Sequence, residues 1–182
     1  MNIYNYNIIF LSGKVGAGKD EIASHLNRKY NYTIFRYADN LKHILTYGGW
    51  DSKKDLRGRK LLQDVGKAFR KWDPDHWVKW LLKDIEYVLE YGVTNICIAD
   101  ARHVNEIEYF KEKWLANHPD SKFLTIRVIG PNHDELREMD SETLSDSSET
   151  DLDYYVMDYY VNNTQTLDNL YHEIDSIVNA HF

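Results

Sequence analysis

Glycines and a lysine near the beginning of the sequence are spaced as a phosphate-binding loop requires. The segment LSGKVGAGKD, residues 11–20, fits the pattern G-x-x-x-x-G-K-[S/T] up to its last position, where Asp20 replaces the hydroxyl residue. In such a loop the glycines let several backbone N–H groups point at one anion, and the lysine adds a mobile positive charge. The alternative is a glycine-rich turn without a ligand. The predicted nucleotide-binding residues are Gly13, Lys14, Val15, Gly16, Ala17, Gly18, Lys19 and Asp20.

Two aspartates are candidate ligands for Mg²⁺. Asp20 stands where the usual hydroxyl would meet the ion, and a carboxylate oxygen is also a good ligand for it, although Asp20 could instead cap the following helix. Asp100 directly follows the apolar run NICIA, at the edge of a sheet where α/β proteins bind their ligands. Arg102, two residues further on, is placed to bind a phosphate; the alternative is a surface salt bridge beside a helix cap.

The segment LRGRKLLQDVGKAFRKW, residues 56–72, carries further polar candidates on a predicted helix. Gln63 has a donor and an acceptor that suit the edge of a base, and Arg70 could meet a phosphate. The alternative is a solvated basic face. Trp72, Trp77 and Trp80 could stack on a base, but their helical spacing favours packing in the core.

Short apolar runs alternate with amphipathic stretches along the chain. Buried strands are predicted at residues 7–11, 33–37, 95–99, 123–129 and 159–161. Helices are predicted at residues 19–29, 40–47, 54–72, 75–90, 104–114 and 167–179. This alternation predicts one α/β domain with a parallel sheet. Residues 134–153 are acidic and rich in serine, and are predicted to form a surface flap or a short helix and loop outside the core.

Composition narrows the class of protein. The chain has 182 residues, a formal net charge of -7 and one cysteine, Cys97, so nucleic acid is an unfavoured partner and an internal disulfide is excluded. No stretch reaches the roughly 18 apolar residues that span a membrane, and the first residues resemble a strand more than a signal peptide. A cytoplasmic location is expected.

Several separate motifs, in order, resemble those of phage-type deoxynucleoside monophosphate kinases. The loop GKVGAGKD has a lysine after its first glycine and an aspartate last, as in that family and in animal-type phosphomevalonate kinases. Asp146 stands where the family has a histidine before its S-E pair, and the chain is short, which implies a small lid. The further similar segments are YADNLKHIL (37–45), GRKLLQDVGKAFRKWDPDHWVKWLLKDI (58–85), NICIADARHVNEIEYF (95–110), TLSDSSETDLD (143–153) and DYYVNNTQTLDNLYHEI (158–174).

The resemblance implies a three-layer α/β/α P-loop kinase fold with a five-stranded parallel sheet, a helical acceptor-binding region at about 38–92 and a short lid at about 131–153. It implies transfer of the γ-phosphate of ATP, with Mg²⁺, to a deoxynucleoside monophosphate, in a phage protein acting in the host cytoplasm and able to form a homodimer. The implied catalytic residues are Lys19, Arg102, Arg70 and the lid residue Arg137, with Arg127 a further lid candidate. The implied acceptor-binding residues are Asp39, Lys42, Arg59, Gln63, Arg70, Trp77 and Arg102.

Two other functions remain open at this stage. A P-loop kinase that phosphorylates a hydroxymethylated base within DNA would look similar, although the net charge of -7 disfavours a DNA substrate. A nucleotide-binding module without turnover would need only the loop. A GTPase is disfavoured because no N-K-x-D sequence follows a later strand.

Overall fold

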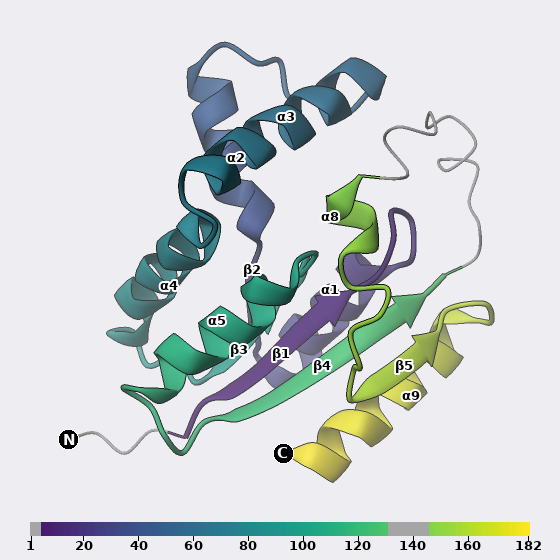
Figure 1. Ribbon diagram of the computed structural model, residues 1–182. Coiled ribbons are helices and arrows are strands. Elements are labelled where there is room, and N and C mark those ends of the chain that lie inside the picture. Colours follow the sequence, from purple (N-terminus) through teal and green to yellow (C-terminus); the bar gives the residue numbers. More distant parts are fainter. Residues whose placement is uncertain (1–4, 131–145) are drawn as a thin grey trace.

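One parallel sheet organises the chain. In the computed structural model, which describes residues 5–130 and 146–182, five strands pair in the order β2-β3-β1-β4-β5 (Figure 1). All four strand pairs are parallel. The predicted α/β class, parallel sheet and five strand positions are therefore confirmed. The strands are β1 (Asn7–Ser12), β2 (Thr33–Phe35), β3 (Asn95–Ile98), β4 (Lys122–Ile129) and β5 (Tyr159–Asn162).

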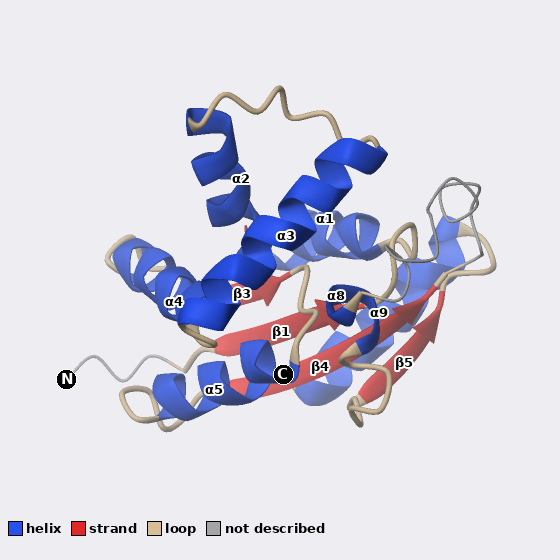
Figure 2. Cartoon of the chain, turned by 45° about the horizontal axis from the view of Figure 1, so that its top comes forward, coloured by secondary structure: helices blue, strands red, loops and turns tan. Residues whose placement is uncertain are grey.

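Helices cover both faces of this sheet, which gives three layers (Figures 1 and 2). On one face α1 (Lys19–Tyr30) packs beside α9 (Leu167–His181). On the other face lie α4 (His76–Leu89) and α5 (Val104–Leu115). The helices α2 (Tyr37–Tyr47) and α3 (Leu56–Trp72) extend past the sheet near the ends of its strands.

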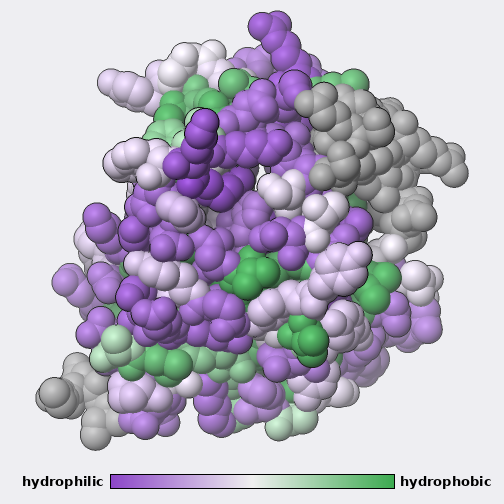
Figure 3. All heavy atoms as spheres, viewed as in Figure 1, coloured by the Kyte–Doolittle hydropathy of each residue, from purple (hydrophilic) through white to green (hydrophobic). Residues whose placement is uncertain are grey.

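The alternation of side chains along the strands explains the two cores. Ile8 and Phe10 of β1 point to the α4 and α5 side, whereas Ile9 and Leu11 point to the α1 and α9 side, and all four are fully buried. A central parallel strand must be apolar on both faces because helices cover both. The surface is different: on the face in Figure 3, hydrophobic residues lie in small separate groups among hydrophilic ones. Within residues 5–130 and 146–182, no helix is long and apolar enough to cross a membrane.

The segment that joins β2 to α2 differs from its prediction. The sequence predicts a strand to residue 37 and a helix from residue 40, but β2 ends at Phe35 and α2 begins at Tyr37. The cause lies far along the chain, because the carboxylate of Asp100 accepts hydrogen bonds from the backbone N–H groups of Tyr37 (2.8 Å) and Ala38 (3.0 Å). These are N–H groups of the first turn of α2, which have no partner within the helix.

The acidic segment also differs from its prediction. Its described part contains a short helix, α8 (Ser147–Thr150), followed by Leu152, which is only 3% exposed and belongs to the core on the α4 and α5 side. The prediction that this segment stays outside the core is therefore wrong at Leu152. The earlier part of the segment, including Arg137, lies outside the described residues.

The burial of Leu152 gives a testable prediction. We expect Leu152→Ala to lower the free energy of unfolding by about 3 kcal/mol, because the change removes buried methyl groups and leaves a cavity. Val156→Ala nearby, at a position that is 84% exposed, should lower it by less than about 0.5 kcal/mol. Urea unfolding of both variants measures the difference. Similar values for the two would contradict the packing of Leu152.

Candidate active site

The glycine-rich loop joins β1 to α1 in a conformation that other residues would not adopt. Gly13 has a φ of 147°, and a Cβ atom there would lie 2.5 Å from the backbone oxygen of Val128. Gly18, the residue before α1, has a φ of 99° in the left-handed region. Both positions therefore favour glycine on backbone grounds alone. We call residues 13–20 the P-loop.

Lys19 is the first residue of α1, and its amino group folds back over the P-loop. Its Nζ donates hydrogen bonds to the backbone oxygens of Gly13 (2.5 Å) and Lys14 (2.9 Å). Burial, followed by the charge of Arg102, lowers the pKa of Lys19 to about 8. The amino group is thus held by carbonyl oxygens beside the loop, where a phosphate could exchange for them.

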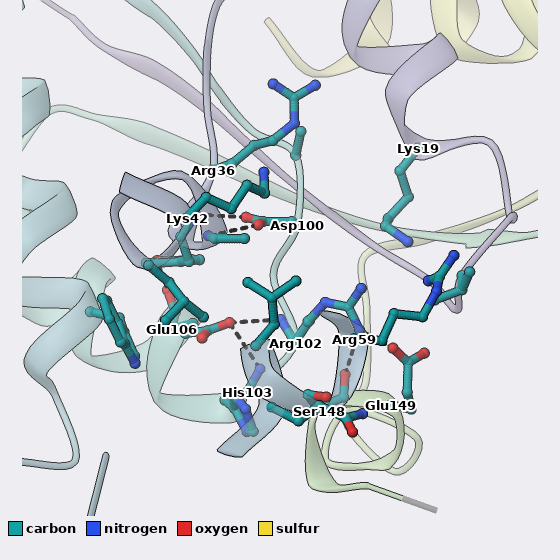
Figure 4. Close-up of a pocket in the computed structure, with 18 of the residues that line it drawn as sticks. Lys19, Arg36, Lys42, Arg59, Asp100, Arg102, His103, Glu106, Ser148 and Glu149 are labelled. Carbon is teal, nitrogen blue, oxygen red and sulfur yellow. Dashed lines mark hydrogen bonds and ion pairs between the residues drawn. The ribbon is translucent and has the colours of Figure 1, made fainter. Parts of the chain in front are cut away.

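A cavity of about 530 Å³ opens beside the P-loop at the carboxyl ends of the strands (Figure 4). It joins residues of the P-loop, of α2, α3, α4 and α5, of the segment after β3, and of α8. The described lining residues are Val15, Gly16, Ala17, Gly18, Lys19, Asp20, Arg36, Tyr37, Ala38, Leu41, Lys42, Lys54, Arg59, Leu62, Gln63, Arg70, Trp77, Ala99, Asp100, Arg102, His103, Glu106, Ser148 and Glu149.

Basic side chains dominate this lining. Among the described residues that face the cavity, seven are lysine or arginine and four are aspartate or glutamate. The whole chain has the opposite balance, with a formal net charge of -7. The cavity is therefore a locally positive site in an acidic protein, as a binding site for phosphates requires. The seven are Lys19, Arg36, Lys42, Lys54, Arg59, Arg70 and Arg102.

The two predicted metal ligands have different surroundings. The side chain of Asp20 is 83% exposed, and its Oδ1 accepts hydrogen bonds from Arg36 at 2.7 and 3.2 Å. It does not cap α1, and in the described part of the chain its Oδ2 has no hydrogen-bond partner. Asp100 is buried, and each of its oxygens already accepts one N–H from α2. No group of three or more His, Cys, Asp or Glu residues that could hold a metal occurs in residues 5–130 and 146–182.

Arg102 contacts the short helix α8. Its Nη1 donates to the backbone oxygen of Ser148 (3.0 Å) and forms an ion pair with the carboxylate of Glu149. Glu149 is buried, although the acidic segment that contains it has the composition of a solvated surface. The S-E pair of the resemblance is therefore at the cavity, next to the predicted phosphate ligand.

Glu106 lies deep in the cavity and connects two predicted arginines. Its Oε2 accepts the backbone N–H groups of Arg102 (2.7 Å) and His103 (3.1 Å), and its Oε1 lies 4.0 Å from Arg70. Burial raises the pKa of Glu106 to about 7, although the backbone hydrogen bond from Arg102 opposes this shift. The Nε2 of His103 is buried and has no hydrogen-bond partner in the described part of the chain.

The predicted acceptor residues divide into those at the cavity and those away from it. Arg59, Gln63, Lys42 and Trp77 line it together with Arg70 and Arg102. Asp39 is not a lining residue, and its carboxylate pairs with Lys42 at 2.6 Å. Trp77 is 3% exposed and donates from Nε1 to the backbone oxygen of Gly66 (3.3 Å), so it belongs to the core and to the cavity wall.

Three further predicted residues lie away from the cavity. Trp72 is 74% exposed, so the prediction of core packing is wrong for that residue. Arg127 does not line the cavity; it donates to Ser12 (3.0 Å) and Asp153 (2.6 Å). Lys14 is not a lining residue, and its Nζ pairs with Asp153 at 3.5 Å.

Sequence reasoning missed several lining residues. Glu106 lies in the similar segment NICIADARHVNEIEYF and Glu149 in the S-E pair, so both segments were a usable signal, although neither glutamate was given a role. Arg36 directly precedes the YADNLKHIL segment, and Lys54 precedes α3, but a single basic residue beside an element carries little information. Leu41 and Leu62 are apolar positions that the helical pattern alone assigns to a core.

Comparison with known proteins gives the fold. No family model matches the chain, and no curated protein sequence is significantly similar to it. A sugar kinase from Janibacter sp. HTCC2649 superimposes with a TM-score of 0.55 at 15% identity, over 96% of this chain and 95% of that one. A dephospho-CoA kinase from Campylobacter jejuni gives 0.54 at 10% identity, over 94% and 95%. An APS kinase from Mycobacterium tuberculosis, in complex with AMPPNP and APS, gives 0.52 at 14% identity, over 97% and 99%.

The chain has the fold of these P-loop kinases. The expected three-layer α/β/α P-loop kinase fold with a five-stranded parallel sheet is therefore confirmed. At such low identities the likeness concerns the fold alone. Any activity of a chain with this fold must be argued from the cavity.

The buried Glu106 gives a prediction about pH. Because burial raises its pKa above that of the unfolded chain, its contribution to stability is present at low pH and is lost as the pH rises through about 7. The side chain of the Glu106→Gln variant cannot ionise. The free energy of unfolding of this variant, relative to that of the native chain, should therefore rise by about 2 to 3 kcal/mol between pH 5 and pH 8.

Urea unfolding at several pH values measures this difference. Glu112→Gln, at an exposed position on the same helix, is the control and should follow the native profile at every pH. Parallel profiles for Glu106→Gln and the native chain would contradict the raised pKa.

Proposed function

We propose that this chain is a deoxynucleoside monophosphate kinase that transfers the γ-phosphoryl group of ATP to a deoxynucleoside monophosphate. The observation that carries the proposal is a cavity in which a P-loop faces an excess of lysines and arginines from α2, α3, the residues that precede them and the segment after β3. Such a cavity can accept two phosphorylated molecules end to end, with the transferring group between them.

The donor half of the proposal rests on the P-loop and the fold. Backbone N–H groups of residues 13–20 would bind the phosphates of ATP, and Lys19 would bridge the leaving and transferring groups. The APS kinase of the same fold is a complex with AMPPNP, a molecule of the ATP type, and this supports ATP as the donor here.

The excess of positive charge in the cavity supports a phosphate as the acceptor. Each carboxylate that lines the described cavity already accepts a hydrogen bond or forms an ion pair: Asp20, Asp100, Glu106 and Glu149. A hydroxyl acceptor would be helped by a base that takes its proton. A phosphate acceptor is already an anion near neutral pH, and what it needs is positive charge, which Arg70 and Arg102 would supply.

The acceptor region at about 38–92 has a wall that suits a base. Leu41, Leu62 and Trp77 give it an apolar surface, and Gln63 offers a donor and an acceptor at the same place. Asp39 would act only through Lys42, with which it pairs. Arg137 lies outside the described residues and is kept in the proposal as a candidate lid residue that binds the transferring phosphoryl group.

Mg²⁺ fits one of the two proposed ligands better than the other. Oδ2 of Asp20 has no partner in the described part of the chain and sits beside the P-loop, so it would hold the ion or one of its waters. Asp100 would act through a water, because both its oxygens accept N–H groups. The ion would neutralise charge on the donor phosphates.

The test is release of ADP from ATP and Mg²⁺ with each nucleoside and deoxynucleoside monophosphate offered separately. We expect turnover with one or a few deoxy acceptors, and a loss of at least about 100-fold in Lys19→Ala because its charge is then absent from the transition state. Lys83→Ala, at an exposed position of α4, should keep the native rate.

Turnover with none of these acceptors, despite measurable ATP binding, would contradict the proposal. DNA that contains hydroxymethylated bases would then be offered as the acceptor. Phosphorylation of that DNA would identify the alternative kinase, and its absence would favour a nucleotide-binding module without turnover.

A further inference from the structure

A short acidic segment ties together the elements around the cavity. We call residues 146–153, which comprise α8 and the turn after it, the acidic strap. It carries four carboxylates, and together they contact α3, the segment between β3 and α5, the start of α5, β4 and the P-loop. The contacts are Asp146 with Lys67 of α3, Glu149 with Arg102, Asp151 with His103 and the N–H of Val104 at the start of α5, and Asp153 with Arg127 of β4 and Lys14 of the P-loop.

The strap is fixed by burial as well as by charge. Leu152 is part of the core, and the side chain of Asp146 accepts the N–H of Ser148 (2.9 Å) at the start of α8. Asp146 and Glu149 are themselves buried. A segment held in this way can fix the position of a side chain that it contacts.

One edge of the Arg102 guanidinium is held by the strap. Nη1 donates to the backbone oxygen of Ser148 and pairs with Glu149, whereas in the described part of the chain Nε and Nη2 make no hydrogen bond or ion pair. Figure 4 shows Arg102 and Lys19 extending toward the same space, with Glu149 beside it. An arginine has five N–H donors in a rigid fork, so one edge can be held while the other binds an anion.

Repulsion between Arg102 and the basic side chains near it makes the contact with Glu149 necessary. Arg102 lies close enough to Lys19 and Arg70 for its charge to act on both, next to burial, in lowering their pKa values. Without a counter-charge, the free energy would fall if Arg102 turned away from these neighbours toward solvent. Glu149 opposes that movement, because its charge favours the inward position of Arg102.

We propose that Glu149 is a positioning residue that holds Arg102 so that its Nε and Nη2 edge binds the phosphoryl group beside Lys19. The proposal deepens the proposed kinase function and rests on it for the identity of that phosphoryl group. It assigns no contact between Glu149 and a substrate.

The proposal and simple electrostatics predict opposite changes in anion binding when the charge of Glu149 is removed. Glu149 is a negative charge at an anion site, so its removal should strengthen anion binding if its charge acts only through the field. If it positions Arg102, its removal should weaken anion binding, because the arginine is then no longer held in place.

A double-mutant cycle on the full chain separates the two effects, with inorganic tripolyphosphate as the probe and isothermal titration calorimetry as the measurement. We expect Glu149→Gln to weaken binding about 5- to 10-fold in the native background. In the Arg102→Gln background the same change should strengthen binding about 2- to 5-fold, because only the field effect is left. Unchanged or stronger binding by Glu149→Gln alone, or equal weakening in both backgrounds, would overturn the proposal.

Two further variants distinguish the loss of the contact between Glu149 and Arg102 from a disturbance of the whole acidic strap. Asp151→Asn removes a charge from the same strap without touching Arg102 and should bind tripolyphosphate as the native chain does; weakening as large as that in Glu149→Gln would overturn the proposal. If Glu149→Gln does not fold, Glu149→Asp replaces it. This variant keeps the charge but is one carbon shorter, so about 3-fold weaker binding is expected, and native binding would overturn the proposal.

Tripolyphosphate binding needs no acceptor and no turnover. A chain that phosphorylates none of the monophosphates can therefore still pass or fail this test. Failure of the kinase proposal and failure of the positioning proposal are for this reason separate results.

Discussion

Mutual repulsion among basic side chains is the constraint on which this site depends. Lysines and arginines from separate parts of the chain face one cavity, and each needs a carboxylate or a carbonyl oxygen nearby to stay there. Asp20 pairs with Arg36, and Glu149 pairs with Arg102. These counter-charges come from α1 and α8, so the helices around the cavity supply partners for cations held by other elements.

Much of the fold follows from information that is local in the sequence. Apolar runs with helical stretches between them predicted all five strands, because a strand buried on both faces must be apolar throughout. The P-loop was predicted for the same reason: the φ values at Gly13 and Gly18 and the position of Lys19 depend on neighbours within a few residues. Residues at the carboxyl ends of parallel strands, such as Asp100, were also placed correctly near the cavity.

What the sequence could not predict depends on contacts between distant residues. The start of α2 at Tyr37 is fixed by Asp100, which no local pattern connects to it. Leu152 is buried and Glu149 is paired inside the cavity, yet both lie in a run of acidic and serine residues that has the composition of a surface segment. Such a run is solvated unless cations elsewhere in the fold face it, and only the three-dimensional arrangement brings Lys67, Arg102 and Arg127 there.

The contrast between an acidic protein and a basic cavity bears on the class of substrate. At physiological ionic strength the field of exposed charges is screened over roughly 8 Å, so a small anion inside the cavity is acted on mainly by the side chains that line it. A polymer such as DNA must also lie along the outer surface, where a chain with a net charge of -7 offers little favourable contact. Electrostatics therefore supports the proposed small phosphorylated acceptor over a nucleic acid, because lysines and arginines gather at the cavity of a chain that is acidic as a whole.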